Sequence, residues 1–296
     1  MPPVNLGIFA KTFPRATVEE VFAAVGASGL RCVQFNFQSA GIPTMADAYP
    51  VLLLKRVQRA AAARAIAIAA VSGTWNMIHP DSRLRRAGLS RLRKLARACR
   101  WLGVPVITLC TGTRDPGDMW RHHPANDHPS AWKDLETTMS AAIRIARMHR
   151  LTLAIEPETG NVVNSPFKAR RLLDTFKSPN LKIVMDPANL LRPEDLGHQR
   201  EILAQAFALL GPDIILAHAK ELGAEGQSGA LAPGAGVLDW DHYLALLRSV
   251  NFKGPLILHG FAEADAVPSA IFVRGKIAAA SNPAAQGTPS PPQPQT

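Results

Sequence analysis

Four short apolar runs, each ending in a carboxylate or an imidazole, constrain the fold of this chain more than any other feature. The residues at these ends are Glu156, Asp186, His218 and His259, separated by 30, 32 and 41 residues. A Pro follows each carboxylate and cannot continue a hydrogen-bonded ladder. One strand-plus-helix unit of a closed barrel takes about 30 residues. The pattern therefore predicts buried parallel strands whose carboxyl ends bring these four side chains to one face.

Apolar runs alternate with amphipathic segments along the whole chain. The expected strands are 4–9, 30–37, 66–72, 104–110, 151–156, 181–186, 214–220 and 255–258. Thr17, Asp81 and Asp239 are placed to cap the helices that follow them. Eight strands alternating with eight helices predict an α/β fold, a (β/α)8 TIM barrel. We expect one domain over residues 1–280, and a disordered tail at 281–296, which is rich in Pro, Gln and Ser.

The net charge of +10 raises the question of a nucleic-acid or acidic partner. Much of the positive charge lies between Arg83 and Arg100, where basic residues interleave with leucines. This spacing predicts an amphipathic helix with a basic outer face. No aromatic residues that stack on bases accompany the basic side, so the pattern favours a solvated face over a phosphate-binding one. We therefore do not expect a nucleic-acid partner.

The cysteines and the termini bear on location. Cys32, Cys99 and Cys110 form no C-x-x-C pair, and two of them lie in apolar runs. They are typical of buried residues in a reducing compartment and are not expected to bind metal. The first residues lack a signal-peptide pattern, and no stretch approaches the ~20 apolar residues of a membrane span. We expect a cytoplasmic protein without membrane contact.

Two carboxylates and two imidazoles at one barrel mouth suit a divalent metal ion. The alternative is that each acid caps a helix or pairs with a basic residue, as buried acids generally do. The barrel-unit spacing favours the metal, because functional residues of barrels lie at the carboxyl ends of strands. We predict one ion bound by Glu156, Asp186, His218 and His259. Mixed nitrogen and oxygen ligands leave Mn, Mg, Co and Zn open.

Further side chains are candidates for substrate binding. Lys220 lies two residues after His218 and so faces the same side, where it either binds a sugar or phosphate oxygen or pairs with a glutamate. Glu158 either faces the site or caps a helix. Asn76 and His79 follow the third strand beside Trp75, as in sites where a sugar stacks on an aromatic ring, although helix-entry chemistry explains His79 equally well.

The long polar segment 111–130 is a candidate lid or binding loop, because loops of this length in compact domains are commonly functional. It contains His122, His123, Asp127 and His128. This cluster suggests a metal, but the surrounding Pro and Asn residues are more typical of a solvated surface loop.

These motifs together resemble the xylose isomerase-like barrel superfamily. It contains sugar and sugar-phosphate isomerases and epimerases, and is related to AP endonucleases of the endonuclease IV type. The resemblance covers residues 4 to about 278. It is carried by four segments: Ile-Glu156-Pro-Glu, Met-Asp186-Pro-Ala-Asn189, Ala-His218-Ala-Lys220-Glu221 and 233–240 (PGAGVLDW).

The resemblance implies a metal held by a Glu, an Asp, a His and a Glu on strands five to eight. Glu156, Asp186 and His218 match the first three. The eighth strand departs from the pattern, since it ends in His259 and its nearest carboxylate is Glu263. Asn189 stands where the family usually has a substrate-contacting His, so we include it among the substrate-binding residues.

By resemblance, the predicted function is metal-dependent isomerisation or epimerisation of a sugar or sugar phosphate through an enediolate. Glu156 is the predicted base, and His259 and Glu263 are the candidates for returning the proton. Two alternatives remain open. The basic helix favours an AP endonuclease-like phosphodiesterase, whereas the small number of histidines at the strand ends disfavours it. A non-catalytic sugar-binding barrel would have lost its chemistry with the eighth-strand Glu. The resemblance also leaves a homo-oligomer open.

Overall fold

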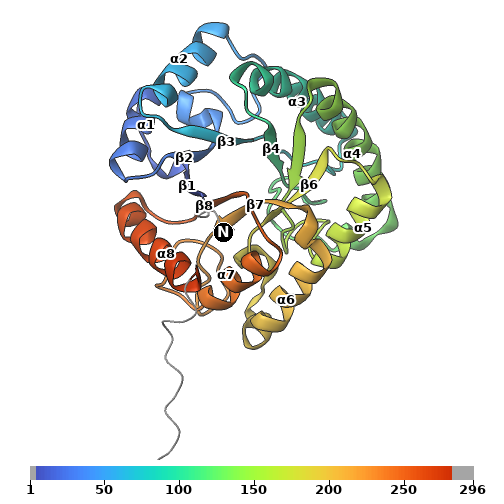
Figure 1. The fold of residues 1–296 in the computed structure, drawn as a ribbon. Helices are drawn as coiled ribbons and strands as arrows, with labels where there is room; N and C mark the ends of the chain where they lie inside the picture. The colour runs from blue at the N-terminus through green and yellow to red at the C-terminus, as the bar shows by residue number, and fades with distance from the viewer. Residues whose placement is uncertain (1–4, 282–296) are drawn as a thin grey trace, which may run out of the picture.

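A computed structural model describes residues 5–281, which form a closed barrel of eight parallel strands surrounded by helices (Figure 1). Each strand pairs with the next, and β8 pairs with β1. The strands are β1 (Asn5–Phe9), β2 (Cys32–Phe35), β3 (Ala67–Ser72), β4 (Val106–Leu109), β5 (Thr152–Ile155), β6 (Leu181–Met185), β7 (Ile214–Ala219) and β8 (Pro255–Leu258). The predicted (β/α)8 fold is confirmed.

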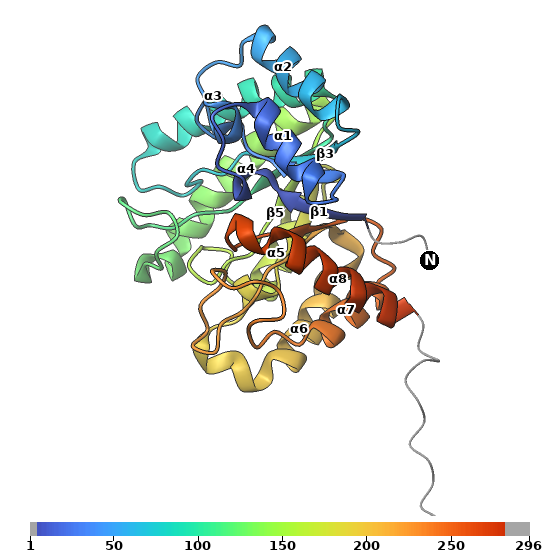
Figure 2. The same ribbon diagram turned by 90° about the vertical axis from the view of Figure 1, so that its left-hand side faces the viewer.

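The helices form the outer ring, and α1 lies beside α8 where the ring closes (Figure 1). They are α1 (Val18–Ala27), α2 (Val51–Ala62), α3 (Ser82–Leu102), α4 (Pro129–His149), α5 (Pro166–Phe176), α6 (Gln199–Leu210), α7 (Trp240–Ser249) and α8 (Ala266–Ser281). Figure 2 shows the ring from the side, with α8 packed next to α7.

Local chemistry fixes where several helices begin. Thr17 and Glu20 form a reciprocal capping box at α1. The Asp81 carboxylate accepts a hydrogen bond from the backbone N–H of Arg83 at α3, and Asp239 does the same for His242 at α7. All three predicted caps are confirmed. Helix α6 begins at Gln199, after a 3-10 segment that occupies Pro193–His198.

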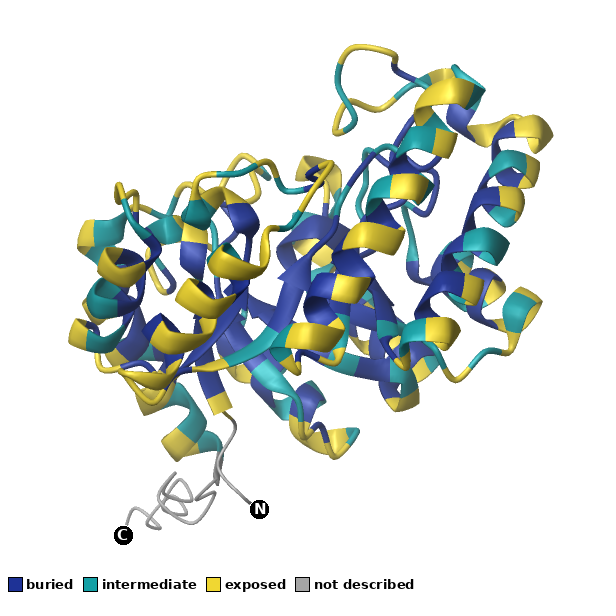
Figure 3. Ribbon diagram, turned by 90° about the horizontal axis from the view of Figure 1, so that it is seen from above, coloured by how far each residue is buried: buried dark blue, intermediate teal, exposed yellow. Residues whose placement is uncertain are grey.

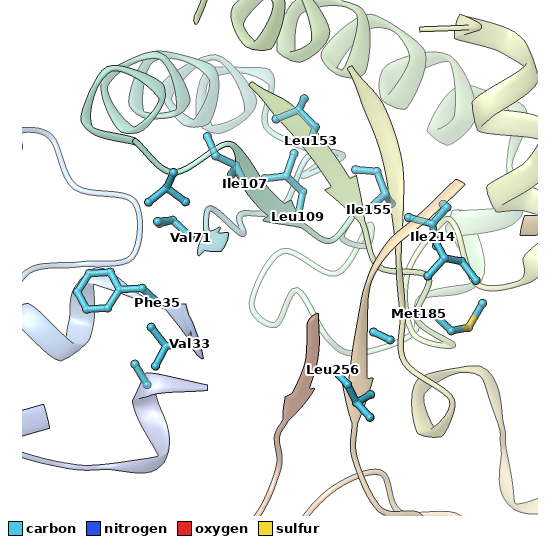
Figure 4. Packing of buried hydrophobic residues seen from close by; sticks show 14 of the residues in the cluster. Val33, Phe35, Val71, Ile107, Leu109, Leu153, Ile155, Met185, Ile214 and Leu256 are labelled. Atoms are coloured by element: carbon cyan, nitrogen blue, oxygen red, sulfur yellow. The ribbon is translucent and has the colours of Figure 1, made fainter. Parts of the chain in front are cut away.

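The main apolar core lies between the strands and the helices. Figure 4 shows part of it, including Phe35, Ile107 and Met185. Exposed residues gather on the outer faces of the helices, while the strands are buried (Figure 3). Helix α3 follows this rule, since Leu92 and Leu95 are buried and most of its arginines are exposed.

The barrel interior has its own layer of small and apolar side chains: Cys32, Ala70, Ala154, Val184, Leu216 and Ile257. Side chains alternate along a strand, so the residue two positions later points to the same side. Those next residues are polar: Gln34, Ser72, Glu156, Asp186, His218 and His259. The strand period therefore places a polar layer above the apolar one, at the carboxyl ends of the strands.

Two expectations bear on the ends of the chain and on membranes. The predicted tail, 281–296, lies outside the described residues except for Ser281, at which α8 ends. Within residues 5–281, no helix combines the length and the apolar character needed to cross a bilayer.

Candidate metal centre

The ends of β5, β6 and β7 bring two carboxylates and an imidazole together. Glu156, Asp186 and His218 each offer one ligand atom, and these atoms lie within 4.8 Å of one another. His218 Nδ1 lies 3.1 Å from Asp186 Oδ2 and 3.3 Å from Glu156 Oε1. All three residues are buried. We call these three residues the cluster.

Gln34 on β2 determines which nitrogen of His218 faces the carboxylates. The Gln34 amide donates to the hydroxyls of Ser72 and Thr108, each at 3.1 Å, so its oxygen faces inward. That oxygen lies 2.9 Å from His218 Nε2 and accepts its N–H. Nδ1 is therefore left facing Glu156 and Asp186, with either a proton or a lone pair for a cation. An outer partner of this kind is usual for a metal-binding histidine.

Asn189 bridges the acidic and basic parts of the site. Its amide nitrogen donates to Glu156 Oε1 at 2.6 Å and to Glu158 Oε1 at 3.2 Å. Its oxygen accepts from Lys220 Nζ at 2.7 Å and from the hydroxyl of Ser228. Glu158 thus faces the site and does not cap a helix. Asn189, Glu158 and Lys220 surround the cluster with groups that bind hydroxyl oxygens.

Lys220 makes its closest contact with a carboxylate inside the site. Its ammonium lies 3.7 Å from Asp186 Oδ2. The alternative pairing with Glu221 is absent among the ion pairs of the described residues, because Glu221 has other partners. Its carboxylate accepts hydrogen bonds from the backbone N–H groups of Leu222, Gly234 and Leu238 and from the Trp240 indole. Glu221 therefore anchors the loop between β7 and α7.

The ionisable groups in and around the cluster shift one another's pKa values. Burial and the neighbouring Glu156 charge raise the pKa of Glu158 to about 8. Burial opposes ionisation of Asp186, but Lys220 and His218 hold its pKa well below the usual range. Burial also opposes a charged His218, yet Glu156 and Asp186 together raise its pKa to about 9. Near neutral pH Glu158 is therefore largely neutral and His218 is protonated, so a divalent ion that binds at the cluster has to displace the His218 proton.

The donor set fits a hard or borderline divalent ion, since it combines two carboxylates with an imidazole held by an outer hydrogen bond. Cys110 is the one thiol nearby, with its sulfur 3.6 Å from Glu158 Oε1. It forms a second potential ligand group with Glu156 and Glu158. Burial raises the pKa of the Cys110 thiol well above its usual value, so it stays protonated and is a poor ligand.

Comparison with known proteins agrees with this architecture. The sequence model of the family described as "Xylose isomerase-like TIM barrel" matches residues 22–276. The chain belongs to this family. The matched segment includes every residue of the cluster and Gln34.

Solved structures of this barrel type are similar over almost the whole chain. A 3-keto-D-glucoside 4-epimerase from E. coli has a TM-score of 0.72 at 16% identity and covers 94% of this chain and 99% of its own. An L-ribulose 3-epimerase has a TM-score of 0.74 at 15% identity, with 98% and 100% covered. A xylose isomerase-like barrel protein from Mycobacterium smegmatis, in complex with magnesium, has a TM-score of 0.71 at 13% identity, with 94% and 97% covered. At identities this low, the TM-scores show a shared fold and no more.

The eighth strand of this family barrel ends in His259, which lies beside the cluster. Its ring centroid is 5.2 Å from that of His218, and its ring packs edge-on against Phe9. Burial, reinforced by His218 and Lys220, lowers the pKa of His259 to about 3, so the ring is neutral. His259 is not among the three residues whose ligand atoms converge in the described structure. Its role as fourth ligand stays a prediction.

The structure does not bring Glu263 to the cluster. Its carboxylate forms an ion pair with Arg15, and its side chain is 33% exposed. Glu263 follows β8 by five residues, within a short 3-10 turn that leads into α8. The pairing with Arg15 gives it a structural partner at the rim.

Asn76 and His79 also have structural partners. The Asn76 amide donates to the carbonyl of Thr113 at 2.8 Å and accepts from the backbone N–H of the same residue at 3.1 Å. His79 Nδ1 accepts from the backbone N–H of Asp81 at 3.0 Å. Both side chains fix the loops after β3 and β4, and neither is hydrogen-bonded to the cluster within residues 5–281. Their role in substrate binding stays a prediction.

Sequence reasoning did not single out Gln34 or Ser228. Gln34 carries a signal, because it is the polar residue in the buried run Cys32–Phe35 and keeps the strand period. Ser228 carries none that we can identify, since it lies in the irregular loop after β7 and reaches Asn189 only through the fold of that loop.

Proposed function

We propose that this protein is a divalent-metal-dependent sugar or sugar-phosphate isomerase or epimerase, with a small-molecule substrate. The observation that carries the proposal is the convergence of Glu156, Asp186 and His218 at one barrel mouth, with the Nδ1 atom of His218 facing both carboxylates. Glu156, Asp186 and His218 would hold the ion. A bound divalent metal supplies Lewis acidity toward a carbonyl and the adjacent hydroxyl of a ketose.

The residues around the cluster suit the other tasks of such a reaction. The Lys220 ammonium and the Asn189 amide can orient sugar oxygens and exclude water from the acidic side of the site. In the proposed reaction the Glu156 carboxylate takes the proton from the carbon next to the carbonyl, and an enediolate forms. His259, whose ring lies beside His218, is the candidate that returns a proton to the carbon. Because its pKa is lowered to about 3, the ring has to take up a second proton from solvent or from a substrate hydroxyl before it donates one.

The mouth of the barrel has room for a sugar. A pocket of about 590 Å³ opens beside the cluster and is lined by Lys220, Ser228, His259, Phe9 and Lys11, among others. Phe9 and Phe261 supply apolar surface, and side chains such as Lys220, Ser228 and His259 supply hydrogen-bonding groups, which is the usual mixture in a small-molecule site.

Comparison supports the same class of reaction. The similar barrels include a 3-keto-D-glucoside 4-epimerase and an L-ribulose 3-epimerase. Another, a xylose isomerase-like barrel protein, was crystallised in complex with magnesium. A reducing compartment, as expected from the unpaired cysteines, is compatible with such a role in the cytoplasm.

The direct test is proton exchange. The purified protein, stripped of metal and reloaded with Mn²⁺, is incubated in D₂O with D-fructose, D-tagatose, D-allulose and L-ribulose. We expect deuterium to enter the carbon next to the carbonyl of at least one ketose in the loaded protein only. Full exchange in the presence of chelator would overturn the proposal. Tight ketose binding without exchange would favour the non-catalytic sugar-binding alternative.

The nuclease alternative gains no support from the described residues. A three-metal nuclease needs several separate ligand sets, whereas the two potential groups found in residues 5–281 share Glu156. The basic face of α3 is paired in part with acids of its own protein, as in the contacts of Arg91 with Asp47 and of Arg85 with Asp134.

A further inference from the structure

A second pocket is lined in part by residues that follow Glu158 and Asn189 in the chain. It measures about 650 Å³ and is formed by the loops that follow β4, β5 and β6. Its lining includes Trp120, His122, Asp127, Thr159, Asn164 and Arg192. None of these residues belongs to the site described above. We call this cavity the Trp120 pocket.

The Trp120 pocket is joined to the edge of the candidate metal centre through the chain itself. Thr159 and Gly160, which line it, directly follow Glu158 in the chain. Consecutive Cα atoms are about 3.8 Å apart, so Gly160 lies within about 8 Å of Glu158 along the backbone. The backbone N–H of Thr159 also donates to the carbonyl of Asn189 at 3.2 Å. The lining of the Trp120 pocket therefore begins one residue after Glu158 and is hydrogen-bonded to the backbone of Asn189.

Trp120 presents a large apolar side chain at a fixed position. The side chain is 49% exposed. Its backbone carbonyl packs so closely on Gly160 that a Cβ there would lie 2.1 Å from the oxygen. Asn126 and Asn161 tie the same two loops together, through hydrogen bonds to the carbonyls of Gly160 and Met119. These contacts hold the loop after β4 against the loop after β5, and so they hold the backbone of Trp120 in place.

Three of the side chains that line the pocket with Trp120 have no hydrogen-bond partner among the described residues. Among residues 5–281, the side chains of His122, Asn164 and Glu194 make no hydrogen bond to the protein, and all three line the pocket. An exposed tryptophan surrounded by available polar groups is the combination that binds a sugar ring, since the ring stacks its C–H face and hydrogen-bonds its hydroxyls.

The charges of the lining argue against a phosphate. Asp127 and Glu194 are acidic, and Arg192 is the one lining residue that always carries positive charge. Lys168 lies 2.8 Å from Asp127 and is engaged with it. A dianionic phosphate would meet two carboxylates, whereas a neutral, hydroxyl-rich ring would meet donors and acceptors.

Resting on the proposed function, we propose that the Trp120 pocket is a subsite for a second sugar ring, and that the substrate is a disaccharide or other glycoside. The reacting ketose unit lies at the cluster, and the attached ring stacks on Trp120. A monosaccharide fills the first position only and gains nothing from this contact. The long loop after β4 thereby selects substrate length.

The test compares ketose disaccharides with the ketose alone. The full-length, Mn²⁺-loaded protein is titrated with lactulose, maltulose, isomaltulose and D-fructose by calorimetry, and the Trp120 indole signal is followed by NMR. We expect at least one disaccharide to bind about five- to tenfold tighter than D-fructose, the size of one aromatic stacking contact. It should also shift the Trp120 signal, which D-fructose leaves in place.

Variants separate stacking from folding. Trp120→Ala should lower the affinity of that disaccharide to the level of D-fructose without changing D-fructose binding, and Trp120→Phe should keep most of the gain. Trp101→Ala is the matched control, because Trp101 on α3 is 39% exposed and lies outside the pocket. It should change neither affinity.

The subsite is overturned if no disaccharide binds tighter than D-fructose, or if Trp120→Ala weakens both ligands by the same factor. Inorganic phosphate that shifts the Trp120 signal and competes with the disaccharide would also contradict it. Deuterium exchange, measured on the same samples, separates this inference from the proposed function. If deuterium exchange occurs but the disaccharide affinity does not depend on Trp120, only the subsite is refuted. If the disaccharide affinity depends on Trp120 but no ketose exchanges deuterium, only the enzymatic function is refuted.

Discussion

Gln34 on β2 and His218 on β7 are joined across the barrel interior, with Gln34 Oε1 2.9 Å from His218 Nε2. The two residues are 184 positions apart in sequence, and the closure of the barrel brings them together. Because the hydroxyls of Ser72 and Thr108 orient the amide, this contact fixes the imidazole tautomer that faces Glu156 and Asp186.

The Gln34 contact predicts a loss of metal affinity when the acceptor is removed. Gln34→Leu should weaken Mn²⁺ binding about 10- to 100-fold, the usual effect of losing an outer partner of a ligating histidine. Gln34→Glu keeps an oxygen acceptor and should retain most of the affinity. Titration calorimetry measures both. Gln38→Leu, at an exposed position of the same region, is the control and should bind metal normally. Unchanged affinity in Gln34→Leu would count against the assignment.

Variants of His259 and Glu263 should differ in their effects on metal binding and on ketose turnover. His259→Gln removes a group that can carry a proton, so we expect turnover to fall at least about 100-fold. Metal affinity should stay within about threefold if His259 acts on the substrate. A parallel loss of metal affinity would instead make it a ligand. Glu263→Gln should change neither quantity, since Glu263 is paired with Arg15.

Glu221 predicts a large change in stability. Glu221→Ala leaves three backbone N–H groups and the Trp240 indole without their acceptor in a buried setting. We expect the free energy of unfolding to fall by about 3 kcal/mol or more, measured by urea denaturation. Glu225→Ala changes an exposed position of the same loop, and its free energy of unfolding should lie within about 0.5 kcal/mol of that of the parent protein. Equal effects of the two variants would refute the anchoring role.

Asp213 predicts a dependence of stability on pH. Burial opposes its ionisation, but hydrogen bonds from Lys182 and Arg170 hold its pKa below the usual value. A depressed pKa stabilises the fold above the unfolded value of about 3.9, and this contribution disappears as pH falls through the folded pKa. Asp213→Asn should therefore cost about 1–2 kcal/mol at pH 7 and progressively less below pH 4.

The control for that measurement is Asp241→Asn, which breaks an exposed pair with Lys276. The Asp241 side chain is 66% exposed, so the loss should stay below about 0.5 kcal/mol at every pH. A cost of Asp213→Asn that does not shrink on acidification would show that the carboxylate charge is not what stabilises the native state.

Much of the fold could be predicted because its determinants are local. Short segments of sequence determine the strand period and the spacing of the polar strand ends. They also determine the helix caps at Thr17, Asp81 and Asp239. They suffice for eight strands and for the convergence of Glu156, Asp186 and His218, since parallel strands of a barrel share one mouth.

The remaining contacts depend on closure of the barrel and on loop paths, which local patterns do not encode. Gln34 reaches His218 only because β2 and β7 face each other across the interior. Asn76 was expected to face a sugar, but the path of the loop after β4 gives its amide the Thr113 backbone as partner. Glu263 was expected near the proton path, and Arg15 from the β1 side of the ring pairs with it instead.

The central claim is that Glu156, Asp186 and His218 bind one cation. A crystal structure of the protein soaked in Mn²⁺, with anomalous data collected at the manganese edge, tests it most directly. We predict one strong peak, about 2.0–2.2 Å from a carboxylate oxygen of Glu156, one of Asp186 and Nδ1 of His218. A metal-saturated crystal with no peak at these three side chains, or with His218 turned so that Nε2 faces the ion, would contradict the account.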